Sequence, residues 1–142
     1  KITLKKQKIL ELGNINAKRD WGYAKDYVYA MWLMLQQKKP EDFVIATGKA
    51  YSVKDFINEC CKILKIKIKW KGKGLKTVGI NTETKKVIIK INPKYYRPAD
   101  VEYLRGDYSK AKKKLKWKVT TNFKELVKIM LQSDLKLENK KI

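Results

Sequence analysis

The stretch from Lys25 to Gln37 constrains the fold most, because it reads as a helix that is apolar almost all the way round. Its apolar members are spread over more than one helical face: Tyr27, Val28, Met31, Trp32, Met34 and Leu35. Pro40 marks the end of this helix. A helix with so little polar surface needs protein on both sides, so we expect further layers to cover it.

Segments of strand length alternate with the helical stretches, which predicts an α/β fold. Phe43–Ala46 is a continuous apolar run, typical of a strand in a buried parallel sheet. Strands are also expected at Leu10–Gly13 and Val87–Ile91, and residues 66–71 alternate like a half-buried strand. Residues 72–83 read as a loop.

Capping patterns place the starts of three further helices. Two of the patterns are pairs, Ser52 with Asp55 and Asn122 with Glu125. In the third, either Asp107 or Ser109 can cap a short helix through Leu115. We expect residues 1–135 to form one folded portion and the polar tail, residues 136–142, to fray.

The lack of histidine excludes sites that need an imidazole, including a Ser-His-Asp triad. Cys60 and Cys61 are adjacent, which disfavours a disulfide between them, and two thiols cannot supply a zinc site. We interpret both as small residues at a helix core, which favours a reducing, cytoplasmic compartment. No apolar run approaches the ~18 residues of a membrane span, and the start does not read as a signal peptide.

Basic residues number 35 against 14 acidic ones, which gives a formal charge of +21. Arg19, Arg97 and Arg105 are the three arginines, and lysine is otherwise spread along the whole chain. A guanidinium grips phosphate or carboxylate with two parallel hydrogen bonds, which lysine cannot imitate. The arginines are therefore the candidates for anion recognition.

A basic nucleic-acid-binding module is one alternative reading. Lysines at 67, 69, 71 and 73 could follow a phosphate backbone, with Trp70 as a stacking platform. The alternation places Trp70 on the apolar side, away from the lysines, and lysines also blunt the edge of a sheet. Nucleic acid is therefore the less favoured partner.

Two short segments combine an arginine with a carboxylate. Arg19 lies where a strand meets a helix; Asp20 could hold its guanidinium and Trp21 could wall a pocket, although a surface ion pair would look the same. Arg97 and Asp100 flank Pro98 and could take a phosphate and a ribose hydroxyl of one nucleotide. The alternative for the second segment is a turn with a capping Asp.

Several longer stretches together resemble the GDP-mannose 4,6-dehydratase family. They occur in order between Leu12 and about Leu135: Leu12–Asn14, Lys18–Val28, Ala30–Gln37, Pro40–Gly48 and Tyr96–Glu102. The resemblance implies the carboxy-terminal, substrate-binding part of an extended short-chain dehydrogenase/reductase, with the NAD(P)-binding Rossmann-like part absent from this chain.

The resemblance also implies a lyase of nucleotide-sugar metabolism, in GDP-fucose biosynthesis. GDP-mannose would become GDP-4-keto-6-deoxymannose through internal redox with NADP and loss of water. The catalytic residues and most of the NADP site would lie before Lys1, so we assign no catalytic, cofactor or metal residue here. We expect the isolated chain to be inactive and the complete enzyme to be a homo-oligomer. An orphan fragment that keeps these motifs without any activity is a further alternative.

The resemblance carries over a clamp for the substrate nucleotide. Arg19 and Arg97 match the two arginines that contact the diphosphate, and Asp100 matches the carboxylate that meets the ribose. Lys18 and Asn14 are further substrate-binding candidates, and Arg105 is interpreted as structural.

Overall fold

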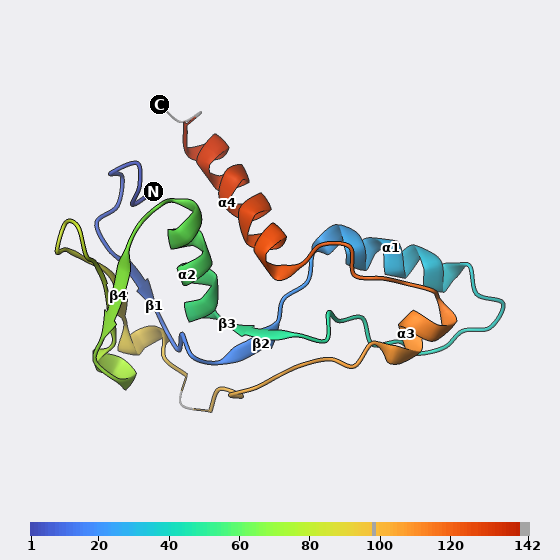
Figure 1. Ribbon diagram of the computed structural model, residues 1–142. Coiled ribbons are helices and arrows are strands. Elements are labelled where there is room, and N and C mark those ends of the chain that lie inside the picture. Colours follow the sequence, from blue (N-terminus) through green and yellow to red (C-terminus); the bar gives the residue numbers. More distant parts are fainter. Residues whose placement is uncertain (98, 140–142) are drawn as a thin grey trace.

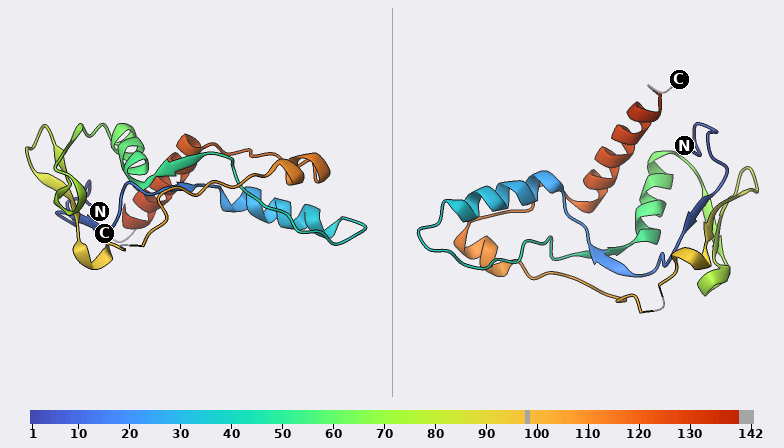
Figure 2. Two further views of the ribbon diagram at one scale, coloured as in Figure 1. Left: turned by 90° about the horizontal axis from the view of Figure 1, so that it is seen from below. Right: turned by 180° about the vertical axis from the view of Figure 1, so that it is seen from behind.

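The computed structural model describes residues 1–97 and 99–139. Figure 1 shows an elongated molecule with a sheet and helix α2 at one end, helices α1 and α3 at the other, and strands β2 and β3 between them. Helix α4 rises from the middle and brings the carboxy-terminal end close to the amino-terminal one, as the views of Figure 2 confirm. Arg19 lies on β2, so the candidate site belongs to the part that connects the two ends.

The larger sheet has four strands in the order β1-β6-β5-β4. Their bounds are Leu10–Leu12 for β1, Ile68–Lys71 for β4, Val78–Asn81 for β5 and Val87–Ile91 for β6. Strand β1 runs parallel to β6, and the other neighbours are antiparallel. Short 3-10 turns, η1 and η2, span Gly74–Lys76 and Pro93–Tyr95. The strands expected at residues 10–13, 66–71 and 87–91 are confirmed.

Strand β5 lies within the segment expected to be a loop, so that expectation was wrong. Gly79 at its centre interrupts the apolar pattern that would have revealed a strand. A Cβ at this position would lie 2.8 Å from Ile68 Cδ1 and 3.0 Å from Ile89 Cβ. Glycine is therefore required by the close approach of both neighbouring strands.

Helix α2, Val53–Ile63, packs on this sheet. Ile57 and Cys61 are buried against Ile88 and Ile89. Both cysteines are free, and burial raises the pKa of Cys60 to about 11, so the thiols are protonated core side chains, as expected.

Helix α2 ends in a Schellman motif with an unusual residue at its turn. The amide of Ile66 donates to the Cys61 carbonyl at 2.8 Å and that of Lys65 to the Lys62 carbonyl at 3.1 Å. Lys65 has φ 56°, in the left-handed region that favours glycine. The motif is thus held by a residue whose Cβ strains it.

Replacing Lys65 by glycine is expected to stabilise the full-length protein by about 1 kcal/mol, because glycine adopts the left-handed conformation without a Cβ clash. Thermal denaturation with each variant measures the change. Lys62→Gly, three residues earlier inside the same helix, is the matched control and should destabilise by about 0.5–1 kcal/mol. A lower denaturation midpoint for Lys65→Gly would contradict the expectation.

Strands β2, Lys18–Asp20, and β3, Ala50–Ser52, form a separate antiparallel pair with Arg19 opposite Tyr51. Tyr51 stacks on Phe123, with ring centroids 3.9 Å apart, at the start of α4. Helix α4 runs over Phe123–Asn139, into the stretch expected to fray as a polar tail. Residues 140–142 lie outside the described residues. The strand pair is thus braced by the start of α4.

The second core lies between α1, Ala24–Leu35, and α3, Ser109–Lys114. Its fully or nearly fully buried members are Ala30, Ala111, Leu115 and Trp117. These contacts cover the inner side of α1 alone. On the other side, Leu35 is 82% exposed and Trp32 is 53% exposed. The expectation that protein covers both sides of this helix is wrong for the described part of the chain, since no further layer lies beyond it.

The strand expected at Phe43–Ala46 is also absent from the described structure. The segment belongs to neither of the two sheets in the described structure. Strand β3, which follows it in the chain, pairs with β2, and no described strand forms ladder hydrogen bonds with residues 43–46. An apolar run of the right length is not a strand until a partner supplies the ladder.

Candidate functional site

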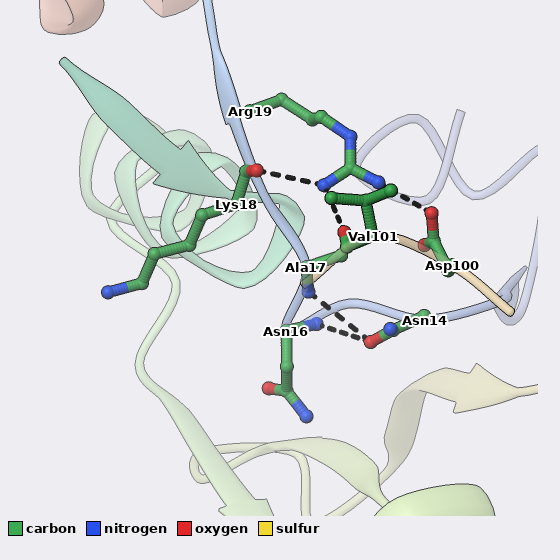
Figure 3. A network of polar contacts seen from close by, with 7 residues as sticks. All are labelled: Asn14, Asn16, Ala17, Lys18, Arg19, Asp100 and Val101. Carbon is green, nitrogen blue, oxygen red and sulfur yellow. Dashed lines mark hydrogen bonds and ion pairs between the residues drawn. The ribbon is translucent and has the colours of Figure 1, made fainter. Parts of the chain in front are cut away.

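Arg19, on β2, reaches across to the segment that follows Asp100. Its Nη2 donates to Asp100 Oδ1 at 2.5 Å, and its Nη1 donates to the Val101 carbonyl at 2.6 Å and the Lys18 carbonyl at 2.8 Å (Figure 3). The structure therefore brings together two predicted site residues that are 81 positions apart in the sequence.

Backbone pairing explains why these residues meet. The Lys18 amide donates to the Glu102 carbonyl at 2.8 Å, and the Leu104 amide donates to the Lys18 carbonyl at 3.0 Å. These bonds form a short parallel bridge between Lys18 and Tyr103 on the side of β2 away from β3. The chain after Asp100 is thus fixed beside Arg19.

Asp20 does not hold the Arg19 guanidinium, contrary to one sequence-based interpretation. Its carboxylate accepts hydrogen bonds from the Thr47 amide at 2.8 Å, the Thr47 hydroxyl at 2.7 Å and the Gly48 amide at 2.9 Å. Neighbouring side chains of a strand point to opposite sides, so the Asp20 carboxylate points away from the Arg19 guanidinium. Asp20 instead ties the loop before β3 to β2.

Trp21 also has a structural role rather than that of a pocket wall. Its Nε1 donates to the Tyr51 carbonyl at 2.8 Å, and its ring stacks on Phe56 with centroids 5.2 Å apart. The ring is therefore part of the packing between the strand pair and α2.

Asn14 and Lys18 lie near Arg19 in the chain but differ in their surroundings. Asn14 Oδ1 accepts from the amides of Asn16 at 2.9 Å and Ala17 at 3.3 Å, which orders the turn between β1 and β2. The exposed Lys18 side chain points away from the Arg19 guanidinium in Figure 3. Substrate binding by either side chain stays a prediction.

Arg97 is exposed and follows the η2 turn. Its carbonyl accepts from the Asp100 amide at 3.3 Å, so both residues belong to one turn, of which Pro98 lies outside the described residues. Within the part of the chain that the structure describes, no hydrogen bond or ion pair occupies the Arg97 guanidinium. Its predicted role in binding the diphosphate is not tested by these contacts.

The Arg19–Asp100 pair is half-buried, with the side chains 33% and 27% exposed. Three of the five guanidinium N–H groups of Arg19 are used by the contacts above, which leaves two for other acceptors. The arrangement can therefore take an anion at its open side.

Two cavities of about 1080 and 590 Å³ flank α2. Neither of them is lined by any of the five candidate residues, Asn14, Lys18, Arg19, Arg97 and Asp100.

Other kinds of site find little support in residues 1–97 and 99–139. There, no cluster of three or more Cys or acidic residues suits a metal ion, and no helix combines the length and apolar character that crossing a membrane demands. Trp70 Nε1 donates to Asn58 Oδ1 at 2.9 Å, and the Trp70 ring packs with the sheet core, as its alternation predicted. The ring is therefore poorly placed to stack on a nucleic-acid base.

Comparisons with known proteins give a consistent result. A family model described as GDP-mannose 4,6 dehydratase matches residues 1–130. The GDP-mannose 4,6 dehydratase of Dictyostelium discoideum is 55% identical over 134 residues, and that of Homo sapiens is 50% identical over 137. The matches cover 94% and 96% of this chain but 38% and 37% of those relatives. The chain thus spans a little over a third of the length of these curated relatives.

Solved structures share the fold at low sequence identity. The dTDP-glucose 4,6-dehydratase of Bacillus anthracis in complex with NAD has a TM-score of 0.71 at 16% identity, and covers 97% of this chain and 38% of that one. RMD from Pseudomonas aeruginosa complexed with NADPH has a TM-score of 0.70 at 16% identity, with coverages of 92% and 37%.

Proposed function

Because this chain belongs to the GDP-mannose 4,6-dehydratase family, we propose that the full-length protein converts GDP-mannose to GDP-4-keto-6-deoxymannose, as a lyase. The expected fold class is confirmed: the chain has the α/β fold of a part of the extended short-chain dehydrogenase/reductases. In this proposal, residues 1–135 are the carboxy-terminal, nucleotide-sugar-binding portion. The match to the family over residues 1–130 is the observation that carries it.

The nicotinamide cofactor, proposed as NADP, supplies a hydride acceptor and donor for the internal redox reaction. The described residues do not offer a dinucleotide site at their strand-to-helix junctions. At the β2–α1 junction, the space beside Gly22 is filled by the Tyr27 ring, and at the β3–α2 junction Ser52 caps the helix with its own hydroxyl. We therefore assign no cofactor contact and no catalytic residue to this chain, which alone is expected to be inactive.

The proposed contribution of this chain is to hold the substrate nucleotide. Arg19 would donate its two free N–H groups to the diphosphate, and Arg97 would donate to the same diphosphate from the turn that follows η2. Asp100 would accept a hydrogen bond from a ribose hydroxyl. The contact between Arg19 and Asp100 supports this assignment, because it shows that both side chains reach one place. Each charge-assisted hydrogen bond is worth about 1.5–3 kcal/mol.

Compartment, pathway and assembly complete the proposal. A reducing, cytoplasmic location agrees with two free cysteines in a core, and GDP-fucose biosynthesis is the proposed pathway. The full-length enzyme is proposed to be a homo-oligomer. Incubating it with GDP-mannose and NADP, and following the 4-keto product, tests the activity; no product from a folded protein would refute it.

Replacing Arg97 by lysine in the full-length protein is expected to weaken GDP-mannose binding about tenfold, because lysine cannot form the two parallel hydrogen bonds of a guanidinium. Arg105→Lys is the matched control, since Arg105 is likewise exposed but lies outside the proposed clamp. Calorimetric titration with GDP-mannose measures both. Equal affinities for the two variants would remove Arg97 from the site.

A further inference from the structure

The chain over residues 100–106, which we call the site segment, carries Asp100 and belongs to no helix or sheet. Residues 101–105 are all exposed, so little side-chain packing holds them in place. Contacts with β2 hold the segment instead: the bridge between Lys18 and Tyr103, and the hydrogen bonds that Arg19 donates. These contacts therefore determine how Asp100 is placed beside Arg19.

Asp20, the last residue of β2, holds the far end of the same segment. Its Oδ2 accepts from the Gly106 amide at 3.4 Å and from the Gly48 amide at 2.9 Å. Its Oδ1 accepts from the amide and the hydroxyl of Thr47 at 2.8 and 2.7 Å. An ionised carboxylate can accept on both oxygens, whereas a side-chain amide has one oxygen and an NH₂ donor. The four donors around this half-buried group therefore require a carboxylate.

Close packing at Gly106 reinforces the hydrogen bond from its amide, which is long on its own. A Cβ at Gly106 would lie 2.3 Å from Ala46 Cβ and 3.3 Å from Val44 Cγ1. Ala46 is buried and directly precedes Thr47, which Asp20 binds. Asp20 thus holds the site segment in two ways, directly through the Gly106 amide and through the loop on which Gly106 packs.

We infer that Asp20 is a positioning residue for the nucleotide clamp: by fixing Gly106 and the Thr47 loop to β2, it sets the placement of Asp100 relative to Arg19. Side chains of successive strand residues point to opposite sides, so β2 holds the segment from both of its faces. Groups that bind a ligand need placement to within about 0.5 Å, which an exposed segment does not provide by itself. The inference rests on the proposed function in taking Arg19 and Asp100 to bind the substrate nucleotide.

Hydrogen exchange of the ligand-free, full-length protein tests the contact with Gly106. Asp20→Asn keeps an acceptor for Thr47 but can turn its NH₂ toward the amides of Gly48 and Gly106, so the Gly106 amide should exchange about tenfold faster or more. Thr47→Val is the matched control: it removes only the hydroxyl donor and should leave Gly106 exchange within about twofold of the unmodified protein. Unchanged Gly106 exchange in folded Asp20→Asn would overturn the inference, whether or not GDP-mannose binds.

Steady-state kinetics with GDP-mannose separate positioning from a merely structural role. Asp20→Asn should raise the KM about tenfold, because the clamp loses its geometry, while Thr47→Val stays within about twofold. A merely structural role would lower the folded fraction, and with it the apparent kcat, and leave the KM unchanged. An unchanged KM for Asp20→Asn would refute the inference alone. No binding of GDP-mannose to the unmodified protein would refute the proposed function.

A second pair of variants tests the same junction with Asp20 intact. Gly106→Ala places a methyl group against Ala46 and should weaken GDP-mannose binding about fivefold or more by displacing the site segment. Adding Ala46→Gly removes the opposing methyl group, so the double variant should recover most of the affinity. Calorimetric titration measures both. Full affinity in folded Gly106→Ala would show that the position of Gly106 does not control the clamp, and would contradict the inference.

Discussion

Replacing Trp117 by alanine is expected to lower the free energy of unfolding of the full-length protein by about 3–5 kcal/mol. The side chain is completely buried, and Tyr27 and Tyr108 meet its ring edge-on at centroid distances of 6.3 and 5.6 Å. Its Nε1 donates to the Asp26 carbonyl at 2.8 Å. The truncation therefore leaves a cavity and removes a buried hydrogen bond. Chemical denaturation measures the loss, with unfolding followed by far-ultraviolet circular dichroism, which reports on the backbone and not on tryptophan fluorescence.

Trp117→Phe is the matched variant for this prediction. It keeps much of the ring volume and removes the hydrogen bond to Asp26, so it should cost clearly less than the alanine variant. A loss below about 1 kcal/mol for Trp117→Ala would show that the core between α1 and α3 contributes little to global stability.

Local patterns in the sequence were sufficient for several elements. Ser52 Oγ accepts from the Asp55 amide at 3.0 Å, and the Ser52 amide donates to Asp55 Oδ2 at 2.9 Å. The capping box needs only residues three apart, so it is visible in the sequence. The same holds for β4, whose alternation survives as alternating burial of Ile68 and Trp70 against exposed lysines.

Elements that depend on distant partners were not predictable in this way. The run Phe43–Ala46 has the composition of a strand, yet a strand also requires a hydrogen-bonding neighbour, which the described residues do not provide. Strand β5 has that neighbour on both sides, and its glycine hides it from pattern analysis. Sequence composition thus reports on side-chain surroundings and not on the pairing itself.

The candidate site shows the same limit. The scarcity of arginine pointed to Arg19, and Asp20 was the carboxylate expected to hold its guanidinium. Asp100 was expected to act beside Arg97 instead. The neighbour in sequence was the natural partner, but alternation along β2 sends Asp20 to the Thr47 loop and leaves Arg19 to Asp100. The bridge between Lys18 and Tyr103, which no local pattern announces, decides between them.

Replacing Arg19 by alanine is expected to weaken GDP-mannose binding by the full-length protein about 100-fold or more. Two charge-assisted hydrogen bonds to the diphosphate are lost, at about 1.5–3 kcal/mol each, and 2.7 kcal/mol already corresponds to about 100-fold. The Asp100 carboxylate also loses its cationic partner beside the bound anion. Calorimetric titration with GDP-mannose measures the affinity, with a thermal denaturation scan to confirm that each variant is folded.

A double variant separates two effects of Arg19→Ala: the loss of the Arg19–diphosphate contact and the exposure of the Asp100 carboxylate to the phosphates. If Arg19 both grips the diphosphate and neutralises Asp100, then Arg19→Ala with Asp100→Asn should bind more tightly than Arg19→Ala alone. The amide no longer repels the phosphates, and its oxygen can still accept from the ribose hydroxyl. If Arg19 serves only to fasten the chain after Asp100 to β2, both Arg19 variants should lose stability while folded protein keeps its affinity. Affinity within twofold of the unmodified protein, in a folded Arg19→Ala variant, would therefore exclude the clamp and leave an ordinary half-buried ion pair.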